Sequence, residues 1–251
     1  MKSIWHYGLA WALSFAMLGS AHAETLLVAA AASLTNAFKD LASSYEQAHP
    51  GTQVLTTFGA SDVVLRQILE GAPADLFASA DQAAMDQAQA AGVIEAGTRR
   101  DFARNTLVLI VPADAPATIR TAQDLRRPEI QRIALGNPRS VPVGRYTLAA
   151  LQQAGLADLL ESRQILGQNV RQVLSYVERG EVDAGFVFAT DAAMAADRVR
   201  IVQTLDTPTP VVYPVALVAR PSLSGAAADF LDYLLSEPGQ AILARYHFSR
   251  P

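Results

Sequence analysis

The sequence feature that most constrains the fold is a junction in which a short apolar run ends at small residues and an amphipathic helix follows. In residues 28–40 (VAAAASLTNAFKD) the apolar run ends at Ser33, and apolar residues then recur at helical spacing. Comparable junctions follow at three later places, Gly59-Ala60-Ser61, Pro142-Val143-Gly144 and Asn169-Val170. Strands that alternate with helices predict an α/β fold in which parallel sheets carry helices on both faces.

The first 23 residues have the organisation of a cleavable signal peptide. Lys2 supplies a positive charge, residues 7–18 form a largely apolar run, and Ala21-His22-Ala23 is a small-x-small cleavage site. As a helix, an apolar run of about 12 residues spans about 18 Å, well short of the ~30 Å hydrocarbon core of a membrane. We therefore expect an exported protein that begins at residue 24 and has no stable membrane insertion.

Charge and cysteine content narrow the class of partner. The formal net charge of the chain is −4, which gives no support for nucleic acid or an anionic membrane surface as a partner. The chain has no cysteine, so we expect neither disulfides nor a lipid-modified N-terminus, and we place the protein free in a periplasm. Histidines are few and have no paired-ligand spacing, so we expect no metal-ion ligands and no cofactor.

The alternation of strands and helices restarts after about residue 103, which indicates two α/β lobes. The expected strands cover residues 25–31, 53–58, 74–78, 106–111, 133–135, 183–188 and 211–218. Two crossings, near residues 103–105 and 206–210, would return the C-terminal helices to the first lobe. We therefore expect residues 24–103 with 211–251 to form lobe 1, and residues 104–210 to form lobe 2.

Each junction places the start of a helix at the end of a strand. The first-turn N–H groups of a helix have no intrahelical partner, and the positive end of the helix dipole favours anions. Ligands bind at the carboxyl ends of strands in doubly wound sheets, so two facing lobes would direct all four helix starts at one small oxyanion. Ser33, Ser61 and Asn169 are also ordinary N-cap residues, so the prediction depends on the whole set.

The chain resembles the periplasmic molybdate-binding proteins of ABC importers over essentially its whole length after residue 23. The matching stretches are residues 30–38 (AAASLTNAF), 58–68 (FGASDVVLRQI), 71–81 (GAPADLFASAD), 136–146 (GNPRSVPVGRY), 169–192 (NVRQVLSYVERGEVDAGFVFATDA), 213–218 (YPVALV) and 244–248 (ARYHF). The resemblance implies a two-lobed periplasmic binding protein fold, each lobe a mainly parallel sheet flanked by helices, with two hinge crossings. It also implies a monomer, not an enzyme, that binds molybdate, and tungstate as well, for delivery to an ABC permease.

The resemblance further implies a set of neutral ligand-binding groups. Ser33 and Ser61 match the hydroxyl and backbone donors of the family's first lobe, and Val143 and Val170 match the backbone donors of its second lobe. Where the family often has a tyrosine hydroxyl, this chain has Phe188. Either the remaining groups supply the affinity, or another donor replaces the missing one, for which Tyr146 is a candidate.

Several alternatives stay open at this level. Asp62 either faces solvent at the start of its helix or lies in the pocket as a hydrogen-bond acceptor, which would favour hydrogen phosphate. A receptor for sulfate or phosphate is the first alternative function. A secreted serine hydrolase that uses Ser33 or Ser61 is a weaker one, because the sequence has no G-x-S-x-G motif. Its general base would have to be His49 or His247, which lie in a turn and near the C-terminus.

Overall fold

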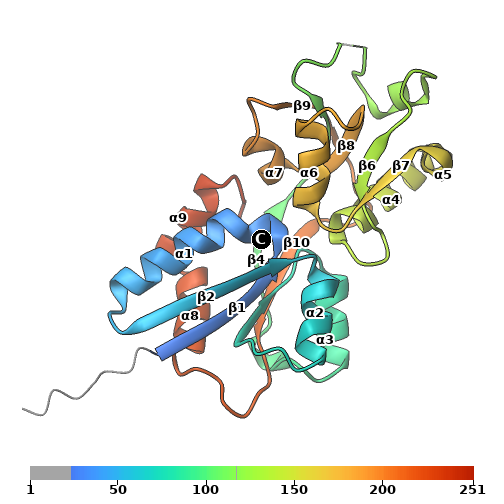
Figure 1. Ribbon diagram of the computed structural model, residues 1–251. Coiled ribbons are helices and arrows are strands. Elements are labelled where there is room, and N and C mark those ends of the chain that lie inside the picture. The colour runs from blue at the N-terminus through green and yellow to red at the C-terminus, as the bar shows by residue number, and fades with distance from the viewer. Residues whose placement is uncertain (1–23, 117) are drawn as a thin grey trace, which may run out of the picture.

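The computed structural model describes residues 24–116 and 118–251 (Figure 1). The predicted signal peptide, residues 1–23, lies outside the described residues. The described chain forms two five-stranded sheets, each flanked by helices. We call each sheet with its helices a lobe: lobe 1 contains β1–β4 and β10, and lobe 2 contains β5–β9.

The sheet of lobe 1 has the strand order β2-β1-β3-β10-β4. Its strands are β1 (Glu24–Ala31), β2 (Thr52–Gly59), β3 (Leu76–Ala78), β4 (Arg100–Asn105) and β10 (Val211–Leu217). Its helices are η1 (Ala32–Leu34), α1 (Thr35–Ala48), α2 (Ser61–Leu69), α3 (Gln82–Ala90), η2 (Ala96–Thr98), α8 (Ala226–Leu235) and α9 (Glu237–Arg245). Strand β1 is parallel to β2 and β3, whereas β10 is antiparallel to β3 and β4.

Helices cover both faces of this sheet, as the alternation predicts. On one face α1, α8 and α9 enclose the main core, where the rings of Phe38, Tyr45 and Phe230 are fully buried. On the other face α2 and α3 bury a separate cluster that includes Val64 and Met85. The apolar stripe of each helix therefore packs on the sheet, and burial of that stripe is the main source of the stability of the lobe.

The sheet of lobe 2 has the order β7-β6-β8-β5-β9. Its strands are β5 (Leu107–Pro112), β6 (Ile133–Gly136), β7 (Gln164–Gly167), β8 (Ala184–Phe188) and β9 (Val199–Leu205). Its helices are η3 (Ala122–Arg126), α4 (Pro142–Gln153), η4 (Ala157–Leu159), α5 (Leu160–Arg163), α6 (Val170–Glu178) and α7 (Ala189–Ala193). Helices α4 and α6 pack against the parallel strands β6 and β8.

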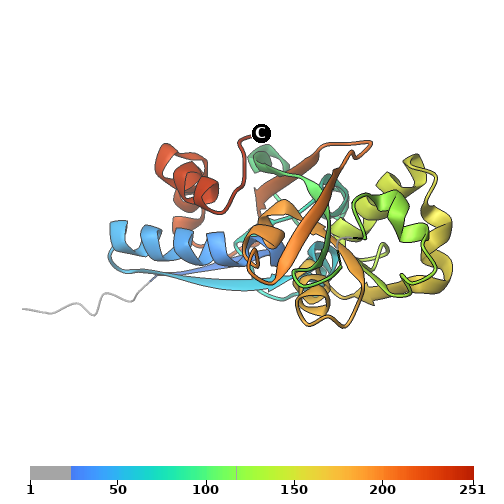
Figure 2. The same cartoon turned by 90° about the horizontal axis from the view of Figure 1, so that it is seen from above.

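The chain crosses from lobe 1 to lobe 2 between Asn105 and Leu107, and it returns between Leu205 and Val211. Strand β4 thus continues to Asn105, past the expected boundary after residue 103. Figure 2 shows the two lobes side by side, with the blue and red helices of lobe 1 at one end and the yellow-green helices of lobe 2 at the other. The two-lobed binding-protein fold is confirmed.

The sheets are mixed rather than mainly parallel because of the path that the chain takes between the lobes. Strands β5 and β10 are the ones that the chain enters directly from the other lobe, and each is antiparallel to both of its neighbours. Helix α4 begins at Pro142, since proline is favourable in the first turn, where its missing N–H costs nothing. No helix among residues 24–116 and 118–251 is long and apolar enough to cross a membrane.

Candidate functional site

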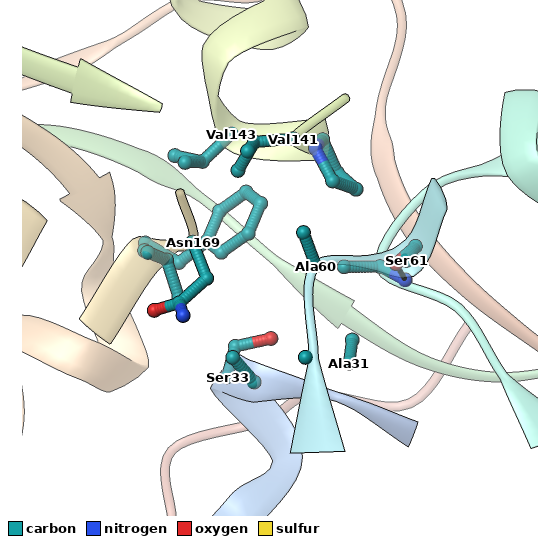
Figure 3. A pocket seen from close by; sticks show the side chains of 13 residues that line it. Ala31, Ser33, Ala60, Ser61, Val141, Val143 and Asn169 are labelled. Carbon is teal, nitrogen blue, oxygen red and sulfur yellow. Dashed lines mark hydrogen bonds between the residues drawn. The ribbon is translucent and has the colours of Figure 1, made fainter. Parts of the chain in front are cut away.

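A small pocket lies between the lobes, and we call it the interlobe pocket. The residues that line it are Ala31, Ala32, Ser33, Gly59, Ala60, Ser61, Ala80, Val141, Pro142, Val143, Asn169, Val170 and Phe188. Figure 3 shows Ser33 and Ala31 on one side of the pocket and Val141 and Val143 on the opposite side. All five residues expected at the site, Ser33, Ser61, Val143, Val170 and Phe188, are therefore brought together, and their role as ligands stays a prediction.

Strand register explains why the helix starts meet here. In lobe 1, Ala31 at the end of β1 is paired with Gly59 at the end of β2. In lobe 2, Gly136 at the end of β6 is paired with Gly167 at the end of β7. Each pair of parallel strands thus ends at one level, and the helical segments that follow begin side by side.

The interlobe pocket is small. Its cavity volume is ≈ 10 Å³, about the room that one water molecule needs. In this arrangement of the lobes the pocket is too small for a sugar or an amino acid.

The serines of lobe 1 are not helix N-caps, which corrects one reading of the sequence. The N-cap of η1 is Ala31 and that of α2 is Ala60, and neither has a side chain that could bind a first-turn N–H. The first intrahelical bond of α2 runs from Val64 N to Ala60 O (2.9 Å), so the N–H groups before it are left for another acceptor. Ser61 Oγ instead accepts a hydrogen bond from Ala80 N (3.0 Å).

Lobe 2 contributes backbone donors in the same way. Pro142 is the first residue of α4 and has no N–H, so Val143 supplies the first N–H of that helix. In α6 the N-cap is Asn169, as the sequence predicts, and its Oδ1 accepts from Gln172 N (3.0 Å). That bond leaves the N–H of Val170 at the pocket.

Two glycines allow the start of α4 to approach the end of β6. A Cβ on Gly144 would overlap the carbonyl oxygen of Gly136, closer than any van der Waals contact. A Cβ on Gly136 would in turn meet the side chains of Val141 and Val143. Only glycine at these positions lets the first turn of α4 lie where Val143 reaches the pocket.

Aromatic side chains close the back of the interlobe pocket. Phe188 is buried, and its ring lies edge-on to Tyr146 (centroids 6.1 Å apart) and to Tyr213 (5.8 Å). The Tyr146 hydroxyl donates to Pro210 O (3.4 Å), and Tyr146 is not among the described residues that line the pocket. The sequence reading missed Tyr213, whose Oη lies 3.0 Å from Ser33 Oγ.

Asp62 does not line the interlobe pocket, so neither reading of it from the sequence is correct. It forms an ion pair with Arg145 of α4 (Oδ2–Nη2 2.7 Å), which also binds Asp81 (Nη2–Oδ2 2.6 Å). Burial lowers the pKa of the Arg145 guanidinium, but the two carboxylates outweigh this and raise it above its ordinary value. We call these three residues the Arg145 cluster.

A second arginine lies near the pocket. Arg171 of α6 pairs with the fully buried Asp191 (Nε–Oδ1 2.7 Å) and donates from Nη2 to Ser33 O (3.3 Å) across the lobes. Burial raises the pKa of the Asp191 carboxyl to about 6, and Arg171 opposes that shift. Since the charge of Arg171 is neutralised by Asp191, the pocket has no unpaired cation from this side chain.

The chemistry of the pocket is that of a neutral donor set. The described residues that line it contribute backbone N–H groups, two hydroxyls and one amide, without a carboxylate or a histidine. A serine nucleophile would need a base, but His49 stacks on Tyr45 at the C-terminus of α1 (centroids 3.9 Å apart). Uncharged donors around a small space can bind an anion, which is the arrangement found at helix N-termini.

Comparisons with known proteins show the family to which the chain belongs. The family model of the bacterial extracellular solute-binding proteins matches residues 26–249. The molybdate-binding protein ModA of Escherichia coli K12 is 38% identical over 246 residues, which cover 95% of each chain. ModA of Haemophilus influenzae is 34% identical, with 95% of this chain and 96% of its own covered. These matches confirm the resemblance inferred from the sequence.

Solved structures are similar over the same length. The periplasmic molybdate-binding protein of Azotobacter vinelandii superposes with a TM-score of 0.79 at 25% identity and covers 90% of this chain and 99% of its own. The sulfate-binding protein SubI of Mycobacterium tuberculosis has a TM-score of 0.80 at 19% identity, with 90% of this chain and 87% of its own covered, and shows the shared fold alone.

Proposed function

The chain belongs to the family of bacterial extracellular solute-binding proteins, and from this premise we propose that it captures molybdate in the interlobe pocket. The bound oxyanion is then delivered to the permease of an ABC importer in the cytoplasmic membrane. The activity is binding and release, without covalent chemistry. Tungstate has the same charge and shape as molybdate, so we propose that it is a ligand as well.

The observation that carries the proposal is the convergence of neutral donors from both lobes on one small space. Ser33 and Ser61 come from lobe 1, and the N–H groups of Val143 and Val170 come from lobe 2. Each charge-assisted hydrogen bond contributes roughly 1.5–3 kcal/mol. Each helix start adds about 0.3–2 kcal/mol for an anion. The hydroxyl and backbone N–H of each serine and the N–H groups of the two valines make six donors, which together can outweigh the dehydration of a dianion without a formal positive charge.

The donor set also favours a fully deprotonated oxyanion. Hydrogen phosphate carries a proton at neutral pH and needs an acceptor, but Asp62, the nearby carboxylate, is bound to Arg145. Molybdate and sulfate need donors alone, so the size of the pocket has to separate them. Selectivity for the larger ion is therefore the part of the proposal that most needs a direct test.

The other parts of the proposal concern the state of the protein. We propose that residues 1–23 are removed on export and that the remaining chain is a periplasmic monomer. The lobes comprise residues 24–105 with 211–251 and residues 107–205, and the crossings between them act as hinges. We propose that ligand release requires the lobes to separate, because residues of both lobes line the pocket.

A panel of oxyanions tests the function. Thermal unfolding of the purified protein is measured with molybdate, tungstate, sulfate and phosphate, and with perchlorate as a singly charged tetrahedral control. A ligand at 100 times its dissociation constant stabilises the fold by about 2.7 kcal/mol. For a chain of this size that raises the midpoint by roughly 5–10 °C. Molybdate should do so at the lowest concentration; stabilisation by phosphate or sulfate alone would contradict the proposal.

A further inference from the structure

We propose that Asn105 and Tyr213 orient the Ser33 hydroxyl, so that its proton is donated into the interlobe pocket. Both are positioning residues, because neither lines the pocket. The inference rests on the proposed function, since it concerns how the same site presents a donor to an oxyanion. It would add one directed donor to a site in which Phe188 has no hydroxyl.

The amide of Asn105 has a fixed orientation, and this decides the direction of its own hydrogen bonds to Tyr213 and Thr190. Its Oδ1 accepts from Thr106 N (2.9 Å), so its Nδ2 is the group that faces Tyr213 and Thr190. An amide nitrogen carries two hydrogens and can only donate. Asn105 Nδ2 therefore donates to Tyr213 Oη (3.2 Å) and to Thr190 Oγ1 (2.9 Å).

Tyr213 is the donor in the hydrogen bond to Ser33. Its hydroxyl has one proton, and its ring is fully buried among Phe102, Phe188 and Phe248. Among the described residues Tyr213 Oη has two hydrogen-bond partners, Asn105 Nδ2, which can only donate, and Ser33 Oγ, 3.0 Å away; Ser33 Oγ is thus the one acceptor available to the buried Tyr213 proton, so we take Tyr213 as the donor. Burial raises the pKa of Tyr213 well above its ordinary value, so the proton is retained.

The result is that Ser33 Oγ accepts from Tyr213 and keeps its own proton for the pocket. Hydrogen bonds in such a chain polarise one another, so each bond makes the next donor stronger. Ser61 reaches the same state by another route, because its Oγ accepts from Ala80 N (3.0 Å). Both serines of the pocket thus have an acceptor site filled by a protein donor, which leaves their protons free for an anion.

A double-mutant cycle tests the proposal. Molybdate affinity is measured by titration calorimetry for the wild-type protein and for Tyr213→Phe, Ser33→Ala and the double variant. Tyr213→Phe keeps the ring packing and should weaken binding about 5- to 10-fold, the range of one neutral hydrogen bond. In the Ser33→Ala background the same change should cost less than about twofold, because Tyr213 acts through Ser33.

Tyr146→Phe is the matched control, since Tyr146 contacts the other side of Phe188 and its hydroxyl donates to Pro210 O. It should change the affinity by less than about twofold. If Tyr213→Phe fails to fold, Asn105→Ala removes the first donor of the chain and should give the same dependence on Ser33. Equal losses from Tyr213→Phe in both backgrounds, or no loss in either, would overturn the proposal. A wild-type protein that does not bind molybdate would instead reject the function itself.

Discussion

Arg145 of lobe 2 forms an ion pair with Asp62 of lobe 1, with Nη2 and Oδ2 2.7 Å apart. The same guanidinium contacts Asp81, also in lobe 1, through Nε and Nη2. Only 25% of the Arg145 side chain is exposed, so water screens these contacts less than it would a surface pair. The Arg145 cluster therefore links the two lobes beside the pocket and favours their closed arrangement.

Removing this guanidinium should weaken ligand binding. Arg145→Met keeps much of the length of the side chain but leaves Asp62 and Asp81 without a cation, so the closed arrangement loses an attraction between the lobes. We expect the molybdate affinity to fall by about 10- to 100-fold, measured by titration calorimetry. Arg126→Met is the control, because Arg126 pairs with Asp158 within lobe 2 and both are exposed. Unchanged affinity in Arg145→Met would show that the cluster does not contribute to closure.

A carboxylate in the pocket should abolish binding. Ser61 is fully buried and lines the pocket, so Ser61→Asp places a negative charge where donors for an anion converge. We expect the affinity for molybdate to fall more than about 100-fold, through both repulsion and the loss of a donor. Ser43→Asp makes the same change on an exposed part of α1 and should leave binding unaltered. Wild-type affinity in Ser61→Asp would mean that the site is elsewhere.

Restoring the missing hydroxyl should preserve or tighten binding. Phe188 lines the pocket and is buried, so Phe188→Tyr adds one donor to the ring that already faces it. A new hydrogen bond to a charged ligand is worth roughly 1.5–3 kcal/mol, from which the cost of burying the hydroxyl is subtracted. We expect equal or up to about tenfold tighter affinity for molybdate by calorimetry. A large loss would show that the ring packs too tightly for an added oxygen.

Asp191 should make stability depend on pH. Burial raises the pKa of its carboxyl from 3.8 to about 6 in the folded protein. Between pH 3.8 and pH 6 the folded state therefore binds more protons than the unfolded state. The contribution of Asp191 to stability therefore falls as pH rises, by roughly 2 kcal/mol between pH 4 and pH 7. We expect the free energy of unfolding of the wild-type protein, relative to Asp191→Asn, to decrease over this range in urea titrations. A relative increase with pH would mean that Arg171 lowers the pKa of Asp191 below its ordinary value.

The close approach of α4 to β6 should not tolerate a methyl group. Gly144→Ala forces the start of α4 away from Gly136, so we expect a loss of about 1–3 kcal/mol in unfolding free energy and weaker binding through Val143. Chemical denaturation and calorimetry measure the two effects. Gly97→Ala is the control, because a Cβ there meets no atom within 4 Å. Equal stability of the two variants would contradict this account of the junction.

The sequence predicted the buried strands well and missed three others, β4, β7 and β9. All three lie at the edges of the sheets. Buried strands such as β5 are continuous apolar runs, whereas an edge strand such as β4 (RDFARN) is mostly polar and partly exposed. Edge strands form because a neighbouring strand offers hydrogen-bond partners, and a local pattern does not report that.

The contacts between residues far apart in the sequence could not be predicted for a related reason. Arg145 and Asp62 are 83 residues apart, and Tyr213 and Ser33 are 180 apart. The first pair meets because of the relative placement of the two sheets, and the second because β10 enters the sheet of lobe 1; no spacing along the chain encodes either. The pocket residues Ser33 and Ser61 were found because strand-to-helix junctions are local features of the sequence.

The position of β10 between β3 and β4 has a consequence for how the protein matures. The second sheet is built from one continuous stretch of chain and can assemble as soon as Leu205 has emerged during synthesis or export. The first sheet lacks a central strand until Val211–Leu217 arrives, and its hydrophobic layer lacks α8 and α9 until almost the last residue. We therefore expect lobe 1 to complete its folding after lobe 2.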